Sequence, residues 1–174
     1  MLTEIDGNIL ESDAQYIVHQ CNCVTDHASG LAYKIFRKYP YSDTYRSDFL
    51  PENKTRKPGT IHILGDGEGK RFVINLYGQV FPGKINKGGL DTEGKRLRYF
   101  INALKEISEI EGLRSVAFPK KIGCDLAGGN WGIYRELIED FADNNPDVEV
   151  LIIDFAGKED KDKFITGLDG LWED

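Results

Sequence analysis

The residues best suited to chemistry in this 174-residue chain lie where a short apolar run meets a small-residue turn. His19 can move a proton near pH 7, and Asn22 can pair with a sugar hydroxyl. The turn that follows, around Ser29 and Gly30, opens a predicted helix. The first turn of a helix has unpaired N–H groups and a partial positive charge. A strand, a small-residue turn and a helix in this order therefore predict a phosphate site.

A second stretch of the same kind follows the apolar run Ser115–Pro119. Gly123, Gly128 and Gly129 allow backbone torsions that other residues resist, and they let a ligand come close to the main chain. Asn130 is a good N-cap for the helix expected next. Two loops of this type, each between a strand and a helix, predict a diphosphate held from both sides.

Other polar residues near these loops leave alternatives open. Asp125 either stabilises its own turn or faces the ribose of a ligand and positions a water. His19, Cys21 and Cys23 alternate along a strand, and with Cys124 they would offer ligands for zinc. The chain has no Cys-x-x-Cys pair, so neither a metal nor a cofactor is expected.

A third glycine-rich stretch, residues 65–70 (GDGEGK), superficially resembles a nucleotide-binding P-loop. Its spacing is wrong, Arg71 stands where a P-loop has Ser or Thr, and a strand follows instead of a helix. The stretch predicts a hairpin turn.

Composition limits the classes of partner that the chain is expected to bind. The net charge of −7 and the pI of about 5.0 argue against nucleic-acid or membrane-surface binding, which needs a basic face. A small anion is still compatible, because backbone N–H groups can hold it. The absence of a long apolar run predicts no membrane span, and the first residues do not resemble a signal peptide. Three cysteines without scaffold spacing indicate reduced thiols and a cytoplasmic location.

Hydrophobic periodicity predicts alternating strands and helices, hence an α/β fold with a mixed, mostly internal sheet. The chain is expected to form one domain over residues 1–157, with a charged tail over 158–174 that either docks as a helix or frays. The stripe expected to face the core in the longest helix holds Leu97, Ile101, Leu104 and Ser108. Strands are expected at Tyr16–Asn22, Thr60–Leu64, Phe72–Tyr77, Ser115–Pro119 and Glu149–Asp154, and helices at Leu31–Lys38, Glu93–Glu111 and Gly132–Asn144, with a further helical piece at Tyr41–Leu50.

The two loops resemble those of macrodomains. The resemblance rests on HQCNC at residues 19–23 with GLA at 30–32, on IGCDLAGGNW at 122–131, and on GNI at 7–9, and it covers about residues 5–155. Within that family the chain looks like the branch of the yeast-type ADP-ribose-1''-phosphate phosphatase and the terminal ADP-ribose–protein glutamate hydrolase. The resemblance implies a three-layer α/β/α fold with ADP-ribose at the carboxyl ends of the central strands.

The resemblance also implies roles for individual residues. Asn8 and Ile9 would contact adenine, Phe155 would lie beside it, and Asn22 would meet the distal ribose. His19 matches the histidine of the phosphatase branch. The loops around the diphosphate would be formed by Ser29, Gly30 and Leu31 on one side and by Gly123, Cys124, Leu126, Ala127, Gly128, Gly129 and Asn130 on the other.

Three positions depart from the family pattern. Asn8 stands where many macrodomains have Asp, and Ala127 stands where the hydrolase branch has an acid. The lysine of that branch falls in a region where neither Lys84 nor Lys87 can be assigned to it.

The expected function is a hydrolase that removes phosphate from ADP-ribose-1''-phosphate or ADP-ribose from a modified protein. His19 would be its general acid/base, and Asp125 a second candidate. The alternative is a non-catalytic module that reads ADP-ribose.

Overall fold

A six-stranded mixed sheet lies between helices in the computed structural model, which describes residues 1–46, 55–85 and 88–155. The strand order is β1-β6-β5-β2-β4-β3. The strands are β1 (Leu2–Asp6), β2 (Tyr16–Cys21), β3 (Ile61–Leu64), β4 (Phe72–Tyr77), β5 (Ser115–Pro119) and β6 (Glu149–Asp154). The helices are α1 (Gly30–Lys38), α2 (Glu93–Ser108) and α3 (Trp131–Asn144), with 3-10 turns η1 (Ile9–Glu11) and η2 (Pro40–Ser42).

Parallel pairing brings the chemistry-bearing loops to one edge of the sheet. The pairs β1–β6, β6–β5, β5–β2 and β2–β4 are all parallel, and only β3 runs antiparallel, to β4. The carboxyl ends of β2, β5 and β6 therefore meet at the same edge, which is where ligands bind in parallel α/β sheets. The hairpin predicted at residues 65–70 joins β3 to β4, as expected.

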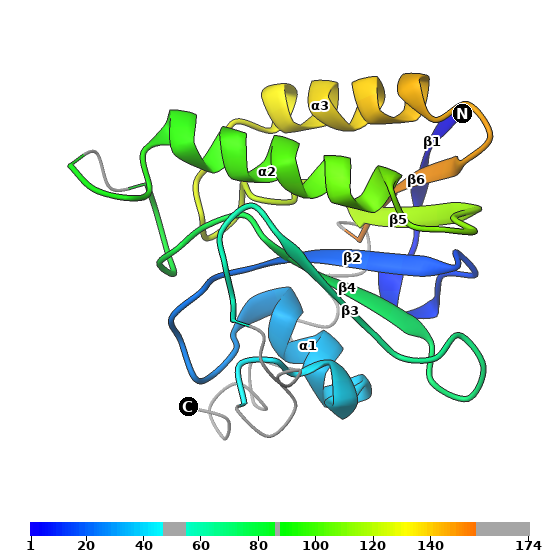
Figure 1. The fold of residues 1–174 in the computed structure, drawn as a ribbon, viewed down its shortest axis with the longest axis horizontal. Helices are drawn as coiled ribbons and strands as arrows, with labels where there is room; N and C mark the ends of the chain where they lie inside the picture. Colours follow the sequence, from blue (N-terminus) through cyan, green and yellow to red (C-terminus); the bar gives the residue numbers. More distant parts are fainter. Residues whose placement is uncertain (47–54, 86–87, 156–174) are drawn as a thin grey trace.

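Helices cover both faces of the sheet (Figure 1). Helices α2 and α3 pack on one face, where Phe100 and Ile138 meet Val18 and Phe118. Helix α1 packs on the other, where Ile35 and Phe36 meet buried residues of β2 and β4. The predicted three-layer α/β/α architecture with a mixed sheet is confirmed.

The predicted stripe of α2 is correct at Leu104, which is buried, and wrong at Ile101. Ile101, expected in the core, is 43% exposed, whereas Arg96, Phe100 and Ile107 are buried. Phe100 takes the inner position because its ring packs edge-on against Tyr134, with centroids 4.8 Å apart. Because Arg96 is charged, a hydropathy pattern does not identify it as part of the buried stripe.

Other sequence predictions differ at the edges of the fold. Strand β1 was not predicted, because four of its five residues are exposed and its composition is polar. The helical piece predicted at Tyr41–Leu50 is a 3-10 turn ending at Ser42, and its residues 47–50 lie outside the described residues, as does the 158–174 tail. Among the described helices, none is both long and apolar enough to cross a membrane.

Candidate functional site

The first loop presents open backbone donors at the start of α1. Ser29, the N-cap, is extended and exposed and makes no capping hydrogen bond with its side chain. Gly30 has φ +60°, a left-handed conformation that favours glycine. The N–H groups of Gly30, Leu31 and Ala32 find no acceptor within the described part of the chain. Three convergent donors at a helix start form an anion site.

The second loop folds back on itself between β5 and α3. The N–H of Gly129 donates to the Gly123 carbonyl at 3.1 Å, and Gly123 and Gly128 have φ values of +75° and +73°. This turn leaves the N–H groups of Leu126 and Ala127 without an acceptor among the described residues. At the loop's end, Asn130 caps α3 as expected: its Oδ1 accepts from the Ile133 N–H at 3.4 Å.

The two loops face each other across the edge of the sheet. A methyl group placed on Gly30 would lie 3.7 Å from Cδ1 of Leu126. Leu126 is 66% exposed, so an apolar side chain of the second loop extends over the start of α1. The pair of opposed loops predicted from the sequence is therefore present, with open N–H groups on both sides.

The side-chain amide of Asn22, which was expected to bind a sugar, makes hydrogen bonds within the first loop. Its Oδ1 accepts from the N–H groups of Val24 and Thr25, at 3.1 and 2.9 Å. Its Nδ2 donates to the Tyr45 hydroxyl at 3.2 Å, and the side chain is buried. These bonds hold the loop in shape, and the ribose contact stays a prediction.

His19 lies in the core, and its expected role in proton exchange stays a prediction. Its side chain is 1% exposed, and its Nε2 lies 2.6 Å from Oδ1 of Asn75. The ring also packs edge-on against Phe36 of α1. Burial lowers the pKa of His19 to about 4. The residue sits three positions before Asn22 on the face of β2 that α1 covers.

Asp125 and Cys124 occupy the second loop in different ways. Asp125 is exposed, and its backbone carbonyl accepts from the Gly128 N–H at 3.2 Å. The Cys124 thiol donates to the Ile122 carbonyl at 3.3 Å, and burial raises its pKa to about 11. Of the two side chains, that of Asp125 is the more exposed.

The adenine residues implied by the resemblance gather at the ends of β1 and β6. The Gly7 N–H donates to the Asp154 carbonyl at 2.9 Å, which joins the segment before Asn8 to the end of β6. Asn8 Oδ1 caps η1 through the Leu10 N–H, at 3.0 Å. Phe155 is half-buried, and the Lys34 ammonium of α1 lies 5.1 Å from its ring centre.

Ile9 is 4% exposed and packs in the core beneath α1. The adenine contact of Ile9 stays a prediction.

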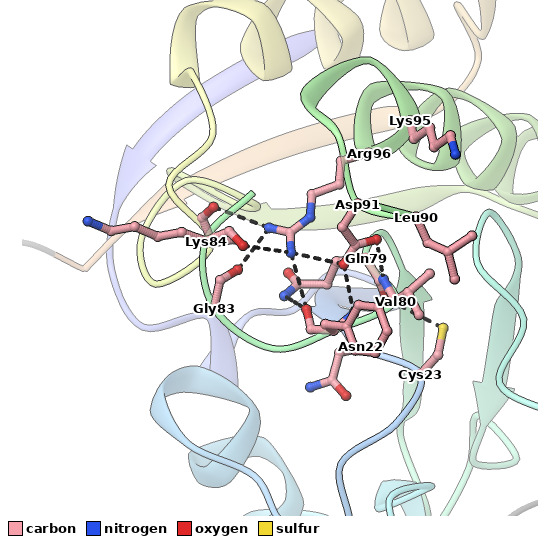
Figure 2. A network of polar contacts seen from close by, with 12 residues as sticks. Asn22, Cys23, Gln79, Val80, Gly83, Lys84, Leu90, Asp91, Lys95 and Arg96 are labelled. Atoms are coloured by element: carbon pink, nitrogen blue, oxygen red, sulfur yellow. Dashed lines mark hydrogen bonds and ion pairs between the residues drawn. The ribbon is translucent and has the colours of Figure 1, made fainter. Parts of the chain in front are cut away.

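Sequence reasoning missed a buried ion pair behind the second loop. Arg96 Nη2 and Asp91 Oδ2 are 3.0 Å apart, and the two side chains are 2% and 0% exposed (Figure 2). Arg96 also binds the Ala127 carbonyl, while the side chain of Lys84 passes over Gly128. The sequence feature that could have revealed this pair is an arginine at helical spacing from Phe100, Ala103 and Ile107. Lys87 lies outside the described residues.

No group of three or more His, Cys, Asp and Glu side chains suited to a metal ion occurs in the described ranges. Two surface hollows lie away from the paired loops. One is lined by Ser12, Asp13, Arg71 and Arg114 among others, and the other by residues of β1 and β6 such as Thr3, Ile5 and Leu151. Neither contains the open N–H groups, so the candidate site is placed at the loops.

Known proteins are similar to this chain in sequence. Over 158 residues the chain is 23% identical to an uncharacterized 17.5 kDa protein of bacteriophage T4, covering 87% of this chain and 94% of that protein. It is 26% identical over 182 residues to the DNA ADP-ribosyl glycohydrolase of Mycobacterium tuberculosis. That alignment covers 98% of this chain but only 46% of the relative's length.

Solved structures share the fold. A protein of unknown function from Bacteroides thetaiotaomicron matches with a TM-score of 0.72 at 25% identity, covering 89% of this chain and 98% of the other. The macrodomain of Mycobacterium tuberculosis DarG matches with a TM-score of 0.64 at 23% identity, covering 88% and 97%. An Oceanobacillus iheyensis macrodomain mutant with ADPR matches with a TM-score of 0.64 at 18% identity, covering 99% and 94%. The family model described as Macro domain matches residues 18–138, which is more than half of the chain, and the chain therefore belongs to the macro domain family.

Proposed function

We propose that this chain binds ADP-ribose between the two opposed loops and hydrolyses a bond at its distal ribose. The observation that carries the proposal is that Leu126 of the second loop lies close to Gly30 of the first, with open N–H groups on both loops. A diphosphate has two charged groups a few ångströms apart, so it suits donors that converge from two sides. Asn8 follows β1 and Phe155 follows β6, and we assign the adenosine half to this end of the two strands.

Two substrate classes fit a hydrolase with this site. ADP-ribose-1''-phosphate would lose phosphate, and an ADP-ribosylated macromolecule would lose ADP-ribose. The macrodomain relatives include an enzyme named for removing ADP-ribose from DNA. Asp125 is the group that we assign to water activation, since it is exposed on the second loop and His19 is enclosed in the core. A carboxylate acts as a general base when it holds a water next to the bond that breaks.

A non-catalytic reader of ADP-ribose is the second candidate. The observation that favours it is the burial of His19, the residue expected to be the main acid/base group. Both candidates bind ADP-ribose, so only turnover separates them.

Calorimetry with ADP-ribose tests the binding, and release of phosphate or of free ADP-ribose tests the chemistry. The substrates are ADP-ribose-1''-phosphate, a protein ADP-ribosylated on glutamate, and ADP-ribosylated DNA. The hydrolase proposal expects turnover of at least one, reduced in Asp125→Asn by roughly a hundredfold, the scale for removing a general base. Binding without any turnover favours the reader, and no binding of ADP-ribose rejects both.

A further inference from the structure

The edge strand β1 carries an exposed apolar residue on the face of the sheet that holds α1. Ile153 of β6 belongs to the core cluster of α1, and its partner across the β1–β6 ladder is Ile5. Residues paired across two strands point to the same face of a sheet, so Ile5 lies on the α1 face as well. Ile5 is nevertheless 43% exposed, although isoleucine is among the residues most often buried. The α1 face is therefore uncovered at its β1 end.

A hollow of about 530 Å³ lies over this end of the sheet. Its floor is formed by alternate residues of β1 and β6, which are Thr3, Ile5, Leu151 and Ile153. The acids that line it are Glu11, Asp13 and Glu149, all of them exposed. Within the described ranges, α2 and α3 cover the opposite face of the sheet (Figure 1). A partly apolar hollow in the thinner layer of a three-layer fold suits an apolar segment.

The chain that continues beyond the described residues starts at one end of this hollow. Strand β6 ends at Asp154, one residue after Ile153 of the floor, and residues 156–174 follow Phe155. In the sequence of this tail, apolar residues recur at the spacing of one helix face, at Phe164, Ile165, Leu168, Leu171 and Trp172. An amphipathic stripe of this kind needs an apolar surface against which to pack.

The lengths of the tail and of the hollow agree. From Ile153 to Glu149 the hollow follows β6 for about 13 Å, at a rise of about 3.3 Å per residue. Residues 164–172 would span about 12 Å at the rise of an α-helix. Residues 156–163 reach up to about 26 Å when extended, which is enough to turn back over β6.

Charge favours the tail over a second copy of the chain as the occupant. Lys161 and Lys163 directly precede the apolar stretch and would bring positive charge to the acids that line the hollow. A symmetric dimer through the same surface would instead bring the acids of two copies together. Like charges facing each other across an interface disfavour association.

We propose that residues 164–172 dock as a helix in the hollow on β1 and β6, with their apolar stripe on Ile5 and Leu151. The sequence left two outcomes open for this tail, a docked helix or a frayed end, and the hollow favours the first. Docking removes the apolar surface of both Ile5 and the stripe from water, which is the driving force. The proposal is independent of the ligand at the opposed loops.

Tryptophan fluorescence of the full chain tests the docking. The chain has two tryptophans, and Trp131→Phe leaves Trp172 as the only one. In that background, Trp172 should emit at shorter wavelength in the folded protein than in urea, and acrylamide should quench it several-fold less. Ile5→Asn should shift the emission to longer wavelength and raise the quenching. Ile63→Asn is the matched control, because Ile63 is 41% exposed on β3, the edge strand at the other side of the sheet.

Urea unfolding of the full chain gives a second readout, through a double-mutant cycle. Ile5→Asn and Leu168→Asn should each lower the urea midpoint by roughly 0.5 M, because each removes buried apolar surface. The double variant should lose little more than either single variant, since both changes break the same contact. When Ile63→Asn takes the place of Ile5→Asn, the two losses should add.

Trp172 that is quenched as strongly in the folded protein as in urea overturns the proposal, and so do additive losses for Ile5 and Leu168. Protection of Trp172 that disappears on dilution assigns the tail to another copy of the chain, and protection unchanged by Ile5→Asn assigns it to another surface. Either result overturns the proposal too. If Ile5→Asn does not fold, Thr3→Glu replaces it with the same expected results, because Thr3 is exposed in the same hollow.

Discussion

His19 Nε2 lies 2.6 Å from Oδ1 of Asn75, and this bond joins the histidine to a buried polar chain. Asn75 Nδ2 donates to Thr44 Oγ1 at 2.9 Å, and the Thr44 hydroxyl meets that of Tyr77. The Tyr77 hydroxyl in turn lies 2.8 Å from Nδ1 of His62. Two histidines are thus connected through side chains of β2, β3 and β4, beneath the first loop. A fully satisfied buried network specifies one arrangement of the core.

Replacing His19 is expected to lower stability and to leave ligand affinity nearly intact. His19→Ala leaves Asn75 Oδ1 buried without its partner and opens space beside Phe36, which costs on the order of 1–3 kcal/mol. Urea unfolding measures the loss. His27→Ala is the matched control, because His27 is exposed and, within the described part of the chain, pairs with its neighbour Asp26.

A His19→Ala protein of unchanged stability would show that the bond to Asn75 contributes nothing. Normal stability combined with a loss of turnover of roughly a hundredfold would return His19 to the mechanism.

The depressed pKa of His19 predicts that stability falls as the pH drops from about 6.5 to about 4. The unfolded chain has a His19 pKa near 6.5 and the folded chain one of about 4, since burial disfavours the charged ring. Between these values the unfolded state binds more protons, so the free energy of unfolding rises with pH. The contribution is fully present above pH 6.5 and amounts to about 3 kcal/mol, from 1.36 kcal/mol per pKa unit.

Urea midpoints at several pH values between 4 and 7 check this pH dependence in the wild type, His19→Gln and His27→Gln. His19→Gln should flatten the slope, because glutamine does not titrate, and His27→Gln should retain it. Equal slopes in the two variants would assign the acid sensitivity to other groups.

A pair of glycine substitutions separates backbone strain from loss of the site. Gly128 and Gly112 have φ values of +73° and +75°, so alanine at either costs about 1 kcal/mol through the same left-handed strain. The alanine methyl at Gly112 meets nothing within 4 Å, whereas at Gly128 it meets Lys84 over the anion loop. Both variants should lose similar stability, and only Gly128→Ala should bind ADP-ribose more weakly. Equal binding by the two would move the diphosphate away from the second loop.

The sequence predicted the loops better than the side chains within them. Glycine spacing after an apolar run depends on local backbone geometry, so the second loop and the Asn130 cap were found correctly. Whether His19 faced a ligand or the core depended on which face of β2 is covered by α1, and that is a tertiary relation. The buried ion pair of Arg96 and Asp91 was also missed, because a charged residue in a helix is normally solvent-exposed.

Ligand choice gives the most direct test of the paired loops. AMP carries the adenine and one phosphate, and therefore reaches the Asn8–Phe155 end but engages only part of the donors near Gly30 and Leu126. Losing one charged, hydrogen-bonded group costs on the order of 1.5–3 kcal/mol, which corresponds to roughly tenfold weaker binding or more. Calorimetry with ADP-ribose, ADP and AMP should rank them in that order, because ADP restores the diphosphate but lacks the distal ribose. AMP binding as tightly as ADP-ribose would reduce the site to adenine recognition, and the opposed loops would then need another ligand.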